Sequence, residues 1–63
     1  MTDTKLAILT GAAGEVGRAT ARKFAEEGWS LILCDRIGRV TIDAAELCRE
    51  FGRTCIGITM DLL

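Results

Sequence analysis

Three short apolar runs alternate along the chain with two segments of helical periodicity. The apolar runs cover residues 6–9, 31–34 and 54–60, and the last of them is rich in β-branched residues. The first run is apolar without alternation, which is typical of a strand buried on both faces of a parallel sheet. The pattern therefore predicts a βαβαβ chain with right-handed crossover connections.

The first helical segment is expected to run from Gly14 to Glu27. Its bulky side chains lie on one face and small residues form the adjoining stripe: Val16, Thr20 and Phe24, then Ala13, Gly17 and Ala21. A small stripe lets such a helix lie close to a sheet. Its solvated face is formed by Arg18, Arg22, Lys23, Glu26 and Glu27. Gly28 is expected to end the helix in the left-handed conformation, and Trp29 to pack at the entrance of the next strand.

The second helical segment also has its apolar residues on one face: Val40, Ala44, Leu47, Cys48 and Phe51. Asp43 and Glu46 have the spacing of a capping box inside this segment. The helix could therefore begin near residue 39 or near residue 43. Gly52 closes the helix, and Gly57 interrupts the third strand.

A glycine-rich stretch, TGAAGEVG at residues 10–17, joins the first strand to the first helix. The first turn of a helix has free N–H groups and the positive end of the helix dipole, and glycines let an anion approach both. We expect Gly11 to permit the tight turn, Gly14 to leave the loop without a side chain, and Gly17 to let the helix pack on the strands. A pyrophosphate fits such a loop, although glycines are also common at ordinary strand-to-helix turns.

An acidic residue ends the second apolar run. Asp35 lies roughly 20 residues beyond the glycine stretch, where the adenosine ribose of a dinucleotide would present its two hydroxyls. The alternative is an ordinary strand-end turn residue. Arg36 follows directly, and it could grip a 2′-phosphate, lie flat on adenine or remain a solvated loop charge.

Together with GRATARKFAEEGW, LILCD and the ending Met60-Asp61-Leu62, the glycine stretch resembles the amino-terminal portion of the short-chain dehydrogenases/reductases. The resemblance covers essentially the whole chain. The classical motif TGxxxGxG is matched at Thr10, Gly11 and Gly17, with Glu15 in place of the middle glycine, whereas the extended motif TGxxGxxG is matched fully. We favour the classical branch because a full helix separates the second strand from the third.

The resemblance implies an α/β, Rossmann-type βαβαβ fold with parallel strand order 3-2-1, an incomplete half of a doubly wound fold. It implies NAD as the cofactor, with NADP as the alternative. The cofactor-binding residues that it implies are Thr10, Gly11, Ala13, Gly14, Glu15, Val16, Gly17, Asp35, Arg36, Asp61 and Leu62. Asp61 and the backbone N–H of Leu62 would meet the adenine edge. The Glu15 carboxylate is expected to point away from the pyrophosphate, where it favours the helix dipole.

The family's catalytic Ser, Tyr and Lys, with YxxxK spacing, and its Asn have no counterpart here. The chain has no tyrosine and no histidine, and Lys5 and Lys23 lie before and within the glycine-motif unit. Residues 1–63 are therefore expected to form the amino-terminal, dinucleotide-binding portion of an oxidoreductase that moves hydride between NAD(P) and an alcohol or carbonyl, and to be inactive alone. The alternatives are a short non-catalytic nucleotide-binding or chain-pairing protein, and an extended-type, epimerase-like or dehydratase-like relative.

Composition and charge limit the classes of binding partner that we expect. A net charge of −1 gives no basic patch for nucleic acid or a membrane surface, and no segment resembles a signal peptide or a membrane span, so we expect a cytoplasmic protein. Cys34, Cys48 and Cys55 lack CxxC spacing and are interpreted as reduced core residues, with no metal site. The expected partner is a small-molecule dinucleotide. Because the first strand would lie at the edge of this sheet, we also expect another copy of the chain, or the remainder of a longer parent, to cover it.

Overall fold

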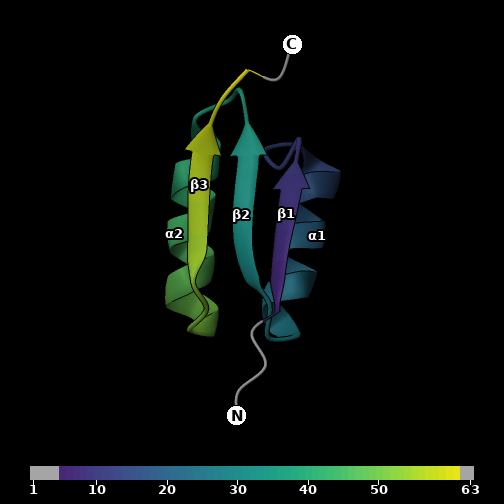
Figure 1. Ribbon diagram of the computed structural model, residues 1–63, viewed down its shortest axis with the longest axis vertical. Coiled ribbons are helices and arrows are strands. Elements are labelled where there is room, and N and C mark those ends of the chain that lie inside the picture. The colour runs from purple at the N-terminus through teal and green to yellow at the C-terminus, as the bar shows by residue number, and fades with distance from the viewer. Residues whose placement is uncertain (1–4, 62–63) are drawn as a thin grey trace.

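The computed structural model describes residues 5–61 and has the predicted element order. The elements are β1 (Leu6–Thr10), α1 (Glu15–Glu26), β2 (Ser30–Asp35), α2 (Arg39–Phe51) and β3 (Cys55–Thr59). All three strands are parallel, and β2 lies between β1 and β3 (Figure 1). This order is the predicted order 3-2-1, seen from the opposite edge of the sheet. The carboxyl ends of the strands therefore meet at one edge, where Asp35 pairs in register with Thr59.

Both helices cover the same face of the sheet (Figure 1). The core lies between that face and the helices, and its largest fully buried side chains are Leu31, Leu33 and Val40. On the opposite face, Leu6 and Ile8 remain 53% and 62% exposed. The prediction that β1 is buried on both faces is therefore not met within residues 5–61, because no described element lies over its second face.

Helix α1 packs on the sheet through its small residues. Ala21 and Ala25 are buried, and a Cβ added at Gly17 would lie 2.5 Å from the Gly11 carbonyl oxygen. Gly17 thus lets the helix approach the backbone closely, but the contact is with the glycine loop at Gly11 and Ala12 and not, as the sequence predicted, with the strands. The expected bulky face does not pack as a unit, since Val16 is 81% exposed. The stripe of small residues is the one that faces the sheet, and this turns Val16 outward.

Helix α2 begins at Arg39, which resolves the two predicted starts in favour of the earlier one. A Cβ added at Gly57 would lie 2.4 Å from the Val40 carbonyl oxygen, so this glycine lets α2 lie directly on β3. One expectation was wrong on this helix: Cys48 is exposed, because it lies beside and not on the face that buries Ala44. Asp43 lies inside the helix and is buried.

The helix ends match the sequence pattern. Gly28 and Gly52 follow α1 and α2 with φ of 95° and 66°, the left-handed region in which a side chain is disfavoured. Trp29 packs edge to face on Phe24 with ring centroids 5.2 Å apart, as expected for a residue at the entrance of β2. Cys34 is buried, in agreement with its predicted place in the core.

Candidate functional site

The glycine loop connects β1 to α1 at the carboxyl edge of the sheet. Gly11 has φ of 65°, which turns the chain away from β1, and the Ala12 N–H then donates to the Cys34 carbonyl at 3.1 Å. This bond holds the loop over the end of β2.

Helix α1 presents backbone donors at this loop. The first intrahelical bond runs from the Arg18 N–H to the Gly14 carbonyl at 2.8 Å. The N–H groups of Glu15, Val16 and Gly17 come before it and therefore lack an acceptor within the helix. Gly14 caps the helix in an extended conformation without a side-chain bond, and a Cβ added there would meet only the Gly11 oxygen, at 3.8 Å. The geometry suits an anionic group that approaches the positive end of the α1 dipole.

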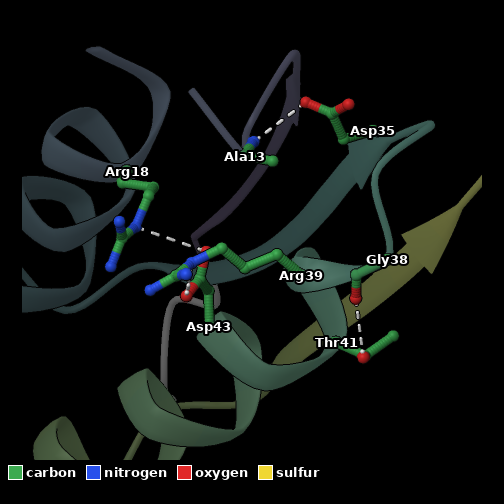
Figure 2. Close-up of polar contacts among 7 residues, drawn as sticks. All are labelled: Ala13, Arg18, Asp35, Gly38, Arg39, Thr41 and Asp43. Atoms are coloured by element: carbon green, nitrogen blue, oxygen red, sulfur yellow. Dashed lines mark hydrogen bonds and ion pairs between the residues drawn. The ribbon is translucent and has the colours of Figure 1, made fainter. Parts of the chain in front are cut away.

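Asp35 joins the end of β2 to this loop. Its Oδ2 accepts from the Ala13 N–H at 2.9 Å, and its Oδ1 accepts from the Ile37 N–H at 3.1 Å (Figure 2). These bonds, that of Ala13 first, hold the pKa of the Asp35 carboxyl below its ordinary value. The side chain is therefore an oriented carboxylate at neutral pH.

The Asp35 carboxylate retains acceptor capacity after these two bonds. A carboxylate has about four lone-pair sites, and each oxygen of Asp35 uses one of them on a backbone N–H. One further acceptor site on each oxygen matches a pair of adjacent hydroxyls, the chemistry of a ribose diol. The residues present thus fit the adenosine end of a dinucleotide whose pyrophosphate lies at α1.

The other predicted residues lie around the same edge. Thr10 ends β1 and Arg36 follows β2, and both are exposed. The Met60 N–H donates to the Asp35 carbonyl at 2.8 Å, so the chain after β3 passes beside Asp35. Asp61 is exposed at this edge, and Leu62 lies outside the described residues.

Glu15 lies in the first turn of α1, where its charge favours the helix dipole. Glu15 also lines a pocket between α1 and α2. The outward orientation of its carboxylate stays a prediction.

Sequence reasoning missed the charged cluster between the helices. The Asp43 side chain is only 7% exposed, and the guanidiniums of Arg18 and Arg39 flank its carboxylate (Figure 2). The available signal was the position of Asp43 three residues after Val40, on the stripe that α2 buries. Its capping-box spacing with Glu46 obscured that signal.

Residues 5–61 contain neither a cluster of metal-binding side chains nor a membrane-spanning helix. Within this range, no three His, Cys, Asp or Glu side chains gather closely enough to hold a metal ion. Neither helix in the same range has the length and apolar character needed to cross a membrane.

A parallel sheet, a glycine loop at a helix amino end and an acid at the end of β2 define the Rossmann class of nucleotide-binding folds. Within that class the chain belongs to the short-chain dehydrogenase family, whose sequence profile, described as short chain dehydrogenase, matches residues 5–63. It is 40% identical over 58 residues to a 1,6-dihydroxycyclohexa-2,4-diene-1-carboxylate dehydrogenase of Acinetobacter baylyi, covering 92% of this chain and 22% of that protein.

Solved structures show the same fold. A bulky-bulky ketone specific alcohol dehydrogenase from Comamonas testosteroni superposes with a TM-score of 0.88 at 32% identity, over 97% of this chain and 26% of that one. A short-chain dehydrogenase from Sphingobium yanoikuyae, solved in complex with NADPH, gives 0.88 at 32% identity, over 92% and 23%. The chain thus spans about a quarter of the length of these relatives.

Proposed function

We propose that residues 1–63 form the amino-terminal dinucleotide-binding portion of an NAD(P)-dependent oxidoreductase that moves hydride between the cofactor and an alcohol or carbonyl. The observation that carries the proposal is the pair of backbone bonds that fix the Asp35 carboxylate against the glycine loop. They hold the Asp35 carboxylate beside the amino end of α1, which supports a single site for a ribose diol and an anionic group. Family membership and the NADPH complex of the Sphingobium relative support a dinucleotide as the ligand.

In this site, the N–H groups at the start of α1 bind the pyrophosphate and Asp35 binds the ribose hydroxyls. The cofactor, when bound, supplies the hydride donor or acceptor. Asp61 and Leu62 would border the adenine. A 2′-phosphate would lie against the Asp35 carboxylate, and the repulsion between the two favours NAD over NADP.

Cofactor titration of the full-length protein tests this proposal. We expect NADH to bind more tightly than NADPH, and Asp35→Ser to reduce that preference on the order of tenfold, because a charge-assisted hydrogen bond is lost. Glu26→Gln, an exposed change at the far end of α1, is the matched control and should leave both affinities unchanged. Equal affinities in the wild-type protein, or tighter NADPH, would contradict the proposed preference.

The 63-residue chain alone is expected to lack dehydrogenase activity. It has no tyrosine and no histidine, and neither Lys5 nor Lys23 occupies a position of the family's YxxxK motif, so the proton relay is missing. A second copy of the chain, or the rest of a longer parent, would cover the edge strand β1. Turnover of an alcohol or carbonyl by the purified chain, with its mass verified, would refute the expected inactivity.

A further inference from the structure

A pocket of about 300 Å³ opens between α1 and α2, on the helix side of the sheet. Arg18 lines it from α1, and Asp43 and Glu46 line it from α2. Asp43 is the buried acid of this group, with its side chain 7% exposed, whereas the Arg18 side chain is 43% exposed. The pocket therefore has a buried carboxylate whose charge has to be balanced locally.

Two arginines balance this charge, one from each helix. Arg18 Nε lies 3.5 Å from Asp43 Oδ2, and Arg39 Nε lies 3.5 Å from Asp43 Oδ1. Neither carboxylate oxygen accepts a hydrogen bond from any described residue. The two guanidinium charges therefore compensate the buried acid without a hydrogen bond, from side chains that are 43% exposed at Arg18 and 52% exposed at Arg39.

Arg39 occupies an unusual place for a cation. It is the first residue of α2, where the helix dipole is positive, and the first turn of α2 has neither an acidic residue nor a side-chain cap. Asp43, one turn later, supplies the compensating negative charge. Figure 2 shows the Arg39 side chain extended toward Asp43 and Arg18, not toward Asp35.

The backbone of Arg39 nevertheless lies close to the Asp35 end of the site. The loop of residues 36–38 separates the two residues, and the Ile37 N–H of that loop donates to Asp35 Oδ1 at 3.1 Å. A guanidinium released from Asp43 would therefore be tethered beside the ribose position. Arginine binds phosphate with several donors at once, so such a group would attract a 2′-phosphate.

We propose that Asp43 positions the Arg39 side chain and thereby influences the preference between NAD and NADP. The ion pair keeps the Arg39 guanidinium between α1 and α2, and this disfavours dinucleotides that have a 2′-phosphate. The inference rests on the proposed function, since it assumes that the ribose lies at Asp35. Asp35 repels the 2′-phosphate directly, and Asp43 withholds a cation that would offset that repulsion.

Binding of NADH and NADPH to the full-length protein tests this role, with Asp43→Asn, Arg39→Ala and the double variant measured beside the wild type. We expect Asp43→Asn to tighten NADPH about threefold to tenfold, with NADH unchanged within about twofold. The tighter NADPH binding should vanish in the double variant, because the released Arg39 side chain is its cause. Glu46→Gln, which removes a charge from the same pocket, should leave the ratio of the two affinities unchanged.

Arg39→Ala alone gives a second test that does not depend on folding of an Asp43 variant. Because Arg39 is already held by Asp43, its loss should leave NADPH affinity unchanged in the wild-type background. Weaker NADPH binding in Arg39→Ala would show that Arg39 already serves the phosphate, and would overturn the proposal. An unchanged ratio in a folded Asp43→Asn protein would overturn it as well.

The result also separates this inference from the function on which it rests. If the wild type binds NADH through Asp35 but Asp43→Asn has no effect on the ratio, only the role of Asp43 is wrong. If the wild-type protein binds neither dinucleotide, both proposals are wrong.

Discussion

The amino ends of α1 and α2 occupy equivalent places, each just after the carboxyl end of a strand, but they differ in chemistry. At α1 the free backbone N–H groups of the first turn follow Gly14, and that turn has a single acid, Glu15. At α2 the chain offers charged side chains, with Arg39 at the first position and no acid in the first turn. The first end suits a group that every dinucleotide has, the pyrophosphate. At the second end the cation is paired with Asp43, and in our proposal it is thereby withheld from the 2′ position of the ribose, the feature that distinguishes dinucleotides.

The two βα units also differ in where their helix touches the backbone. In the first unit the close contact lies in the loop itself, between Gly17 of α1 and the Gly11 carbonyl. In the second unit it lies on the following strand, between Gly57 of β3 and the Val40 carbonyl. Substitution at Gly17 should therefore disturb both stability and the glycine loop, whereas substitution at Gly57 should disturb stability alone.

The largest loss of stability is expected for Gly57→Ala. The added Cβ would lie within 2.4–2.7 Å of Val40 and Thr41 backbone atoms, which cannot move without displacing α2. We expect the free energy of unfolding of the full-length protein to fall by about 3 kcal/mol. Urea titration measures this loss, and a change below about 0.5 kcal/mol would show that α2 does not lie this close to β3.

Gly17→Ala is expected to cost about 2 kcal/mol and to weaken dinucleotide binding as well. The new Cβ would lie 2.5 Å from the Gly11 oxygen and 2.8 Å from the Ala12 Cα, so the loop has to shift. Gly14→Ala is the matched control for stability, because its Cβ would make only an ordinary contact of 3.8 Å. Equal unfolding free energies for the two variants would contradict the close packing at Gly17.

Asp35→Asn should alter the acid dependence of stability. Backbone N–H bonds lower the pKa of Asp35 from its ordinary value of 3.8, so its contribution to stability is present above that value and is lost as the pH falls through the lowered pKa. The difference between wild type and variant should therefore be present at neutral pH and shrink as the pH falls below 3.8. A difference that grows with acid would be incompatible with the bonds to Ala13 and Ile37.

The smallest effects are expected for Glu15→Gln, which should lower stability but strengthen pyrophosphate binding. Loss of the first-turn acid should lower stability by a few tenths of a kcal/mol, because the helix dipole loses a favourable partner. Pyrophosphate binding should strengthen by up to about 1 kcal/mol, because a nearby like charge is removed. Denaturation and NADH titration of the same samples test this prediction. If stability and NADH affinity both fell, or both rose, it would be wrong.

The order of strands and helices could be predicted because it depends on local patterns. Apolar runs, helical periodicity and the glycines after each helix predict the element bounds to within one or two residues, except for the start of α2, which the pattern left open between residues 39 and 43. The glycine stretch and Asp35 could be singled out for the same reason, since their spacing is short and follows from the βαβ unit. The structure brings Asp35 onto the loop, while the binding roles of the predicted site residues stay predictions.

Tertiary packing determined what the sequence alone did not resolve. Periodicity places Val16 and Cys48 near an apolar face, but only the packed helices show that each lies beside the buried stripe. Asp43 is buried because arginines from two helices reach it, and one of them, Arg18, is distant in sequence. In the sequence Gly57 only interrupts a strand, whereas in the structure its missing Cβ makes room for the Val40 carbonyl of α2. Each of these outcomes depends on partners that a local pattern does not contain.

A crystal structure of the full-length protein with NADH bound tests the central claim most directly. We expect the pyrophosphate to accept hydrogen bonds from the N–H groups at the start of α1, and the Asp35 carboxylate to accept from both hydroxyls of the adenosine ribose while it keeps its bond to the Ala13 N–H. A dinucleotide bound elsewhere, or a ribose without contact to Asp35, would contradict the assignment of this edge of the sheet as the cofactor site.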